Sequence, residues 1–252
     1  MSQLDDEFAG RRVVVTGAGS GMGLATARLL VERGAAVVGV ARSEDSLSAI
    51  RDAGAATVRG DMTIEADRAE LIEVAGPVDG LVIAHGETTG QPIASVTQAD
   101  YDRLLASNLG SVFFLLQAFA HRLPDDGAVV TVSSTAAKTG AIPEVAVYAA
   151  AKAGVLSLTR SFASAHAARG MRVNCLLPGI IDTAMQRRFL ELNAPLRQMT
   201  PDELHAERLA ATPMRRAGTP DEAAEVILFL LSARSSYLTG QGLNVAGGFV
   251  TW

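Results

Sequence analysis

The sequence has only one cysteine, Cys175. An intramolecular disulfide is therefore impossible, and a metal site built on thiolates is not expected. Basic side chains are also too few to dominate, since 22 Lys and Arg stand against 27 Asp and Glu. A phosphate backbone requires a basic face, so this balance argues against nucleic acid as the main partner.

Long hydrophobic runs are missing as well. The most apolar stretch, Val112–Ala120, contains Gln117 and is too short to span a bilayer. The first ten residues are polar and carry Asp5, Asp6 and Glu7, which is the wrong character for a signal or transit peptide. We therefore expect a cytoplasmic protein without a membrane partner.

Apolar residues are abundant, at 48% of a 252-residue chain, which suits one large domain spanning residues 1–252. Short Val/Ile/Leu/Ala runs alternate with helical patterns. The expected strands are Arg12–Thr16, Ala36–Ala41, Ala56–Gly60, Gly80–Ala84, Ala128–Ser133, Arg172–Leu177 and Gly242–Val245. The expected helices are Gly21–Arg33, Ser43–Ala53, Ile64–Val74, Thr97–His121, Ala146–Arg169 and Asp221–Ser232. This alternation predicts an α/β fold: a Rossmann-like, doubly wound parallel sheet of about seven strands with helices on both faces.

The alternation stops over Ala184–Arg216, which Pro195, Pro201 and Pro213 punctuate. An interruption of this length favours a substrate lid, and the alternative is a small helical insert. Its apolar candidates for a pocket are Met185, Phe189, Leu190, Leu196 and Met199. Its arginines Arg187, Arg188 and Arg197 are expected to lie on a solvated helix face rather than to bind an anion.

A glycine-rich turn follows the first strand, with the spacing G-x-x-x-G-x-G between Gly17 and Gly23. Glycine lets the backbone approach a pyrophosphate closely, and the next helix directs its first amides at the anion. The alternative is a connection that binds nothing. The residues predicted to contact a dinucleotide here are Gly17, Gly19, Ser20, Gly21, Met22 and Gly23.

The end of the second strand bears on which dinucleotide binds. Arg42 stands there without an acidic residue, and a guanidinium can pair with a 2′-phosphate, so NADP(H) is favoured over NAD(H). The alternative is that Arg42 is merely solvated and Ser43 caps a helix. Asp61 and Met62, just after the third strand, either flank the adenine or form an ordinary turn.

Tyr148 and Lys152 lie four residues apart on a predicted helix, so their side chains share one face. An ammonium beside a phenol stabilises the phenolate and would lower its pKa, which would let Tyr148 exchange protons near neutral pH. Upstream, Ser133, Ser134 and Thr135 end the fifth strand, where parallel sheets bind ligands. These hydroxyls either polarise a carbonyl or satisfy a turn.

Taken in order, these motifs resemble the classical short-chain dehydrogenase/reductase family from about Gly10 to Gly248. The features that carry the resemblance are TGAGSGMG, Asp61, Asn108, Ser133-Ser134, YAAAK, Pro178-Gly179 and the tail from Thr219 to Gly248. The resemblance implies an oxidoreductase that interconverts a ketone or aldehyde and an alcohol by hydride transfer.

It also implies roles for particular residues. Tyr148 would be the general acid/base, Lys152 would lower its pKa and bind the nicotinamide ribose, and Ser134 would polarise the carbonyl. Asn108 would hold a relay water, while Ile181 and Thr183 would hold the carboxamide. The remaining cofactor contacts implied are Ala84, Gly86, Pro178 and Gly179.

Three positions depart from the family pattern. The asparagines expected after the fourth strand are replaced by Ala84 and His85, and His85 is expected to be a packed or turn histidine rather than a ligand contact. Ser134 precedes Tyr148 by one residue more than usual, which keeps Thr135 as a minor candidate. Ser20 stands where many NADP-dependent members carry a basic residue.

The family also implies a homotetramer built on helices Thr97–His121 and Ala146–Arg169. The apolar ending Phe249–Trp252 is predicted to pack at a subunit interface. Two other functions remain open on the same fold: a dinucleotide-binding sensor, and a non-redox dehydratase or epimerase.

Overall fold

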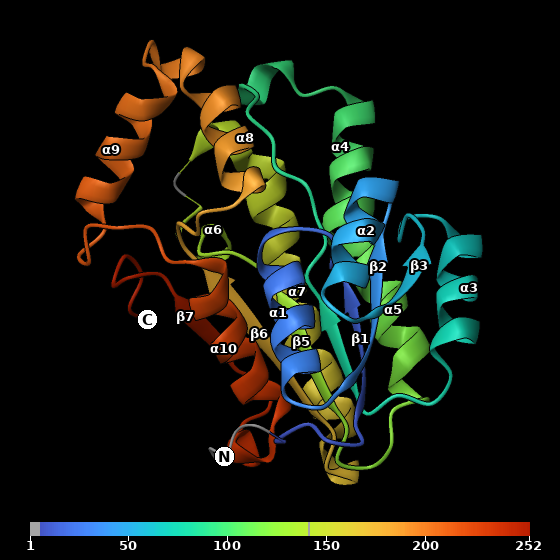
Figure 1. Ribbon diagram of the computed structural model, residues 1–252. Coiled ribbons are helices and arrows are strands. Elements are labelled where there is room, and N and C mark those ends of the chain that lie inside the picture. The colour runs from blue at the N-terminus through green and yellow to red at the C-terminus, as the bar shows by residue number, and fades with distance from the viewer. Residues whose placement is uncertain (1–5, 141) are drawn as a thin grey trace.

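The computed structural model describes residues 6–140 and 142–252 (Figure 1). Its centre is one parallel sheet of seven strands in the order β3-β2-β1-β4-β5-β6-β7. The strands are β1 (Arg12–Thr16), β2 (Ala36–Ala41), β3 (Ala56–Arg59), β4 (Gly80–Ile83), β5 (Ala128–Val132), β6 (Arg172–Pro178) and β7 (Gly242–Val245). The predicted doubly wound fold is confirmed, and each strand lies within one residue of its expected bounds.

Helices cover both faces of this sheet, because alternate side chains of the strands point to opposite sides. On one face, α1 (Gly21–Glu32), α2 (Glu44–Asp52) and α10 (Pro220–Leu231) pack on Val13, Val15 and their neighbours. On the other, α3 (Glu65–Ala75), α5 (Ser111–Ala120) and α7 (Ala146–His166) pack on Val14 and its neighbours. The strands are therefore buried on both sides, which explains why they read as continuous apolar runs.

The helix expected over Thr97–His121 is interrupted. It begins as α4 (Gln98–Leu105), becomes a π-helix over Ala106–Gly110 and continues as α5. The whole helix, Gln98–Ala120, has 23 residues and a mean hydropathy of 1.3, so by length and composition alone it would be able to cross a membrane. The apolar run Val112–Ala120 is thus only the second half of a longer apolar helix. Leu115 and Phe119 are fully buried against the sheet, which makes it a core helix of this fold.

The segment 184–216 is a helical insert that also forms a wall of the candidate site. It contains α8 (Ala184–Asn193), a 3₁₀ turn (Pro195–Arg197) and α9 (Pro201–Ala211), and a small core of Leu190, Ala194 and Leu204 joins the two helices. The bridge between Ile181 and Gly218 brings the two ends of the insert together. Both helices stand beyond the carboxyl edge of the sheet (Figure 1).

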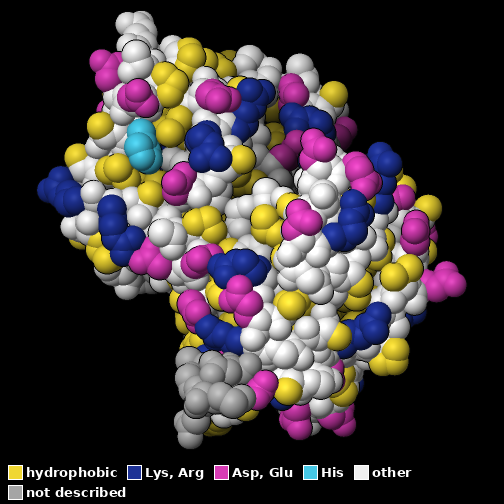
Figure 2. All heavy atoms as spheres, in the orientation of Figure 1, with side chains coloured by type: hydrophobic (Ala, Val, Ile, Leu, Met, Phe, Trp, Pro, Cys, Tyr) yellow, Lys and Arg dark blue, Asp and Glu magenta, His cyan; other side chains and the backbone are white. Residues whose placement is uncertain are grey.

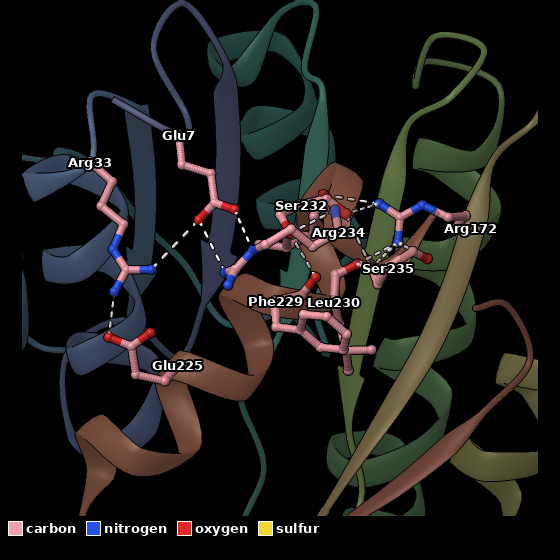
Figure 3. Close-up of polar contacts among 10 residues, drawn as sticks. Glu7, Arg33, Arg172, Glu225, Phe229, Leu230, Ser232, Arg234 and Ser235 are labelled. Atoms are coloured by element: carbon pink, nitrogen blue, oxygen red, sulfur yellow. Dashed lines mark hydrogen bonds and ion pairs between the residues drawn. The ribbon is translucent and has the colours of Figure 1, made fainter. Parts of the chain in front are cut away.

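Arg172 at the start of β6 fastens α10 to the sheet (Figure 3). Its buried guanidinium donates to the carbonyls of Leu230 (2.6 Å), Leu231 (3.0 Å) and Ser232 (3.0 Å). A helix leaves its last carbonyls without partners, so this cation satisfies them and complements the helix dipole. Beside it, Glu7 pairs with both Arg234 (2.7 Å) and Arg33 (3.6 Å) and ties the start of the chain to α1 and α10.

Candidate active site

The glycine-rich turn between β1 and α1 has the backbone that its sequence predicts. Gly17 and Gly21 have backbone φ angles of +69° and +52°, which residues other than glycine rarely adopt. A Cβ on Gly17 would come within 2.8 Å of the His85 backbone, and one on Gly23 within 2.2 Å of the Gly17 carbonyl oxygen. Glycine at these positions therefore permits the tight turn that brings β1, α1 and the end of β4 together.

The first turn of α1 is left open for an anion. Its N-cap residue, Ser20, makes no capping hydrogen bond, and the turn contains no acidic residue. By contrast, α4, α9 and α10 each begin with a capping box formed by a threonine and an acidic side chain. Free amides at a helix N-terminus bind phosphate well, so α1 fits the pyrophosphate of a dinucleotide.

A cavity of about 310 Å³ adjoins this turn, beyond the carboxyl ends of β1, β2 and β4. The predicted cofactor residues that line it are Gly17, Gly19, Ser20, Gly21, Met22, Gly23, Arg42, Asp61, Met62, Ala84, Gly86 and Thr183. Arg42 lies 3.5 Å from Asp61 and is 69% exposed. Burial of Asp61 raises its pKa, but hydrogen bonds from Thr63 and the charge of Arg42 outweigh that effect and leave the pKa below its ordinary value.

Tyr148 and Ser134 meet at a second cavity, which the ends of β5 and β6 and the start of α7 enclose. Burial raises the pKa of the Tyr148 phenol, and a hydrogen bond with Ser134 opposes this shift. Ser134 is partly exposed to the cavity whereas Thr135 is buried, so Ser134 is the hydroxyl that faces the phenol. The raised pKa corrects our expectation that Lys152 would lower it, because burial is the largest effect on the phenol.

Lys152 lies on the next turn of α7, and its ammonium stands 5.7 Å from the centre of the Tyr148 ring. Its Nζ donates to the Val132 carbonyl at 3.0 Å, which fixes the side chain against the end of β5. Burial lowers the pKa of Lys152 to about 8. The amine therefore changes its charge within the range in which enzymes are usually assayed.

Asn108 lies in the π-helix, and its side chain is fully buried behind the cavities. Its Oδ1 accepts from the Glu87 amide at 3.2 Å, and its Nδ2 donates to the Leu104 carbonyl at 3.1 Å. A Cβ on Gly86 would come within 2.7 Å of Asn108 Oδ1 and 3.3 Å of Lys152 Nζ. Asn108, Gly86 and Lys152 therefore form one cluster, and π-bulges of this kind are common at functional sites.

His85 lies in the walls of both cavities, but its ring is held by the protein itself. Nε2 lies 2.7 Å from the Ser111 hydroxyl, which donates to the Ser107 carbonyl at 2.8 Å. On the other side of the ring, Nδ1 lies 2.7 Å from Thr16 Oγ1. Burial lowers the pKa of His85 to about 3, so the ring is neutral. The ring packs against Thr16 and Ser111, and whether it also contacts a ligand stays a prediction.

The second cavity has a volume of about 360 Å³ and shares Met22, Ala84, His85, Thr183 and Met185 with the first. It also contains the remaining predicted residues, Pro178, Gly179 and Ile181. A dinucleotide that fills the first cavity can therefore reach the phenol of Tyr148 in the second.

The insert contributes to this second cavity differently from our expectation. Met185 and Phe189 line it, but Leu190 packs inside the insert, Met199 packs against that small core and Leu196 is exposed. Arg187 and Arg188 lie on the solvated face, as expected. Arg197 lines the cavity, although we expected it on the solvated face. Three residues that we did not predict also line the cavity: Gln186, Arg208 and Phe249.

The ending Phe249–Trp252 packs on its own chain only in part, since Phe249 and Trp252 are 46% and 72% exposed. Val250 is buried, Phe249 lines the second cavity, and Lys138 donates to the Trp252 carbonyl. Asn244 Nδ2 also donates to the Val250 carbonyl at 3.1 Å. The tail therefore forms part of this subunit's own cavity wall.

The chain belongs to the short-chain dehydrogenase/reductase family, which confirms the resemblance seen in the motifs. A family model described as "Enoyl-(Acyl carrier protein) reductase" matches residues 17–250. Members of this family bind a nicotinamide dinucleotide, and the chain is an oxidoreductase acting on CH-OH donors.

Particular relatives span nearly the whole chain. Cis-4-hydroxycyclohexanecarboxylate dehydrogenase of Sinomonas cyclohexanicum is 40% identical over 98% of this chain and 99% of its own length. The 3-oxoacyl-(acyl-carrier-protein) reductase of Salmonella typhimurium is 35% identical over 96% of this chain and 98% of its own. The solved structure of levodione reductase matches with a TM-score of 0.88 at 31% identity, covering 96% of this chain and 98% of that one.

Proposed function

We propose that the protein interconverts a ketone or aldehyde and the corresponding alcohol, with Tyr148 exchanging the proton. The observation that carries this proposal is that Tyr148, Ser134 and Lys152 line a cavity that shares five wall residues with the one at the glycine-rich turn. The bound dinucleotide would supply or accept the hydride. Names of relatives include dehydrogenases and reductases alike, so both directions are consistent with them.

In the reductive direction, Ser134 donates a hydrogen bond to the carbonyl oxygen and orients it toward the phenol. Tyr148 then gives its proton to that oxygen, and its raised pKa keeps the proton available at neutral pH. Lys152 would bind the ribose next to the ring and, through a water held at Asn108, would return a proton to Tyr148. Thr183 and Ile181 would hold the carboxamide.

We propose NADP(H) rather than NAD(H) as the dinucleotide. The exposed Arg42 guanidinium stands at the end of β2 and can turn from Asp61 to a 2′-phosphate. The hydroxyls of Ser20, Ser43 and Ser46 line the same part of the first cavity. A set of ketones and alcohols assayed with NADPH and NADH in parallel tests this preference, and equal kcat/KM with both cofactors would contradict it.

Tyr148→Phe tests the central role. The variant removes only the phenolic oxygen, so we expect turnover to fall by about 100-fold or more, as losing a general acid does. Affinity for NADPH, measured by fluorescence titration, should stay within about twofold. A sensor on the same fold would show no turnover to lose, and a dehydratase or epimerase would turn over without net consumption of NADPH.

A further inference from the structure

Arg208 lines the second cavity and has no ion-pair partner among the described residues. It lies on α9, and its guanidinium stands 4.2 Å above the ring of Phe189. Nη1 is buried and makes no hydrogen bond with any residue among 6–140 and 142–252. Burial, and then the charge of Arg197, lowers the pKa of Arg208 to about 10, so it remains charged at neutral pH.

The neighbouring charges do not neutralise it. Glu207 is the nearest candidate, but its carboxylate points to Arg197 at 3.3 Å and is 55% exposed. Within the described parts of the chain, Arg208 has no ion pair, whereas Arg187 and Arg188 on the insert's outer face pair with Asp182 and Glu191. Among the charged residues of the second cavity, Lys152, Arg197 and Arg208 outnumber Glu207, so the wall is positive.

A second unpaired donor accompanies this cation. The side-chain amide of Gln186 on α8 lines the same cavity, and its Nε2 is also buried without a hydrogen-bond partner among the described residues. Buried donors are nearly always satisfied in native proteins, and a buried charge most of all. Two such donors in one wall indicate that a ligand provides the acceptor.

We propose that the substrate is an oxo acid or hydroxy acid whose carboxylate binds Arg208, with Gln186 as a second donor. The proposal rests on the proposed function, since the carbonyl or hydroxyl carbon of the same molecule would lie at Tyr148 and Ser134. Phe189, Leu204 and Phe249 line the cavity as well, so the skeleton between the two ends is apolar.

A carboxylate fits this wall better than other anions or an uncharged group. The planar guanidinium donates two parallel hydrogen bonds that match carboxylate geometry. A neutral ketone would leave both donors unpaired, and binding it would then bury them further. A cavity of about 360 Å³ suits a small compact acid.

The test compares 4-oxocyclohexanecarboxylate with its methyl ester, which differ in charge but hardly in shape. We expect the full-length protein with NADPH to prefer the acid by about 30-fold or more in kcat/KM, as a buried charge pair provides. Arg208→Met should bring this ratio close to one. Arg208→Lys, which keeps the charge but not the paired donors, should give an intermediate ratio. Arg188→Met is the matched control, because it removes an exposed arginine of the insert, and it should keep the wild-type ratio.

A binding measurement separates this proposal from the proposed function. Calorimetry in the presence of NADP⁺ gives the affinity for cyclohexanecarboxylate and for its neutral amide. Tighter binding of the acid, lost in Arg208→Met, supports the carboxylate site even if no ketone is turned over, in which case the proposed function alone fails. Equal binding of acid and amide, or an acid preference that survives Arg208→Met, overturns the carboxylate site even if neutral ketones are reduced.

Discussion

Two titratable side chains of the site have pKa values that burial moves in opposite directions. The pKa of Tyr148 is raised, and the pKa of Lys152 is lowered to about 8. Both shifts favour the neutral form, because burial penalises charge of either sign. The site therefore holds a protonated phenol at neutral pH next to an amine that is close to losing its proton.

These shifts predict the pH dependence of both directions. Reduction uses protonated Tyr148 and charged Lys152, so kcat/KM should be level below pH 8 and fall about tenfold per pH unit above it. Oxidation uses the phenolate, so its rate should rise with pH. Lys152→Arg keeps the cation, and the falling limb of the reductive profile should then move to higher pH. A wild-type profile without that limb would contradict the role of Lys152.

Single residues also show where sequence-based prediction ends. The i, i+4 spacing placed Tyr148 and Lys152 on one face correctly, but spacing contains no information on burial, and the pKa of Tyr148 was therefore expected in the wrong direction. Arg208 was not singled out because it stands among other charged residues of α9. That its guanidinium has no hydrogen-bond partner at Nη1 can be seen only in the folded chain, among the described residues.

Among the elements, the strands were predictable and the irregular helix was not. Strands buried on both faces have a plain apolar signature, whereas the π-helix at 106–110, where Asn108 bonds to Glu87 and Leu104, has no such signature. The glycine-rich turn was predicted because steric exclusion at Gly17 and Gly23 leaves few other residues possible. The insert was expected as a lid or a small helical unit, and α8 and α9 combine the two features.

Arg172 provides a prediction about α10. In Arg172→Met, several buried carbonyls at the end of this helix lose their donor, and we expect the free energy of unfolding to fall by about 3 kcal/mol. Urea unfolding measures the change. Arg160→Met removes an exposed arginine from α7 and should cost less than about 0.5 kcal/mol. Equal midpoints for the two variants would show that Arg172 does not fasten α10.

At the scale of the whole molecule, the described residues divide into a rigid sheet domain and the insert above its carboxyl edge. Acidic and basic side chains are interspersed over the face seen in Figure 2. Elsewhere, α5 exposes Phe113 and Phe114, whose rings meet edge to face with their centroids 5.4 Å apart. We propose that this exposed aromatic pair, next to Phe162 of α7, forms part of the subunit interface of a homotetramer.

Phe114→Glu tests that assembly. Burying a carboxylate at a subunit interface costs more than Arg68, which lies 4.8 Å above the Phe114 ring, would offset. We therefore expect the proposed tetramer to dissociate into smaller species, measured by sedimentation velocity. Ile93→Glu places the same charge on another exposed apolar residue, 61% accessible, and should leave the mass unchanged. A Phe114→Glu protein with the wild-type sedimentation coefficient would exclude α5 from the interface.

Thr183 has a consequence for the order in which ligands arrive. Its Oγ1 caps α8 by accepting a hydrogen bond from the backbone amide of Gln186 at 3.2 Å, and the residue lines both cavities. A dinucleotide lying against Thr183 would steady the first turn of α8, which holds Met185 and Gln186 in place for whatever arrives next. Steady-state kinetics should therefore be sequential with the dinucleotide adding first. The oxidised dinucleotide should then inhibit competitively against the reduced one and non-competitively against the ketone, whereas a random mechanism would show that α8 needs no such support.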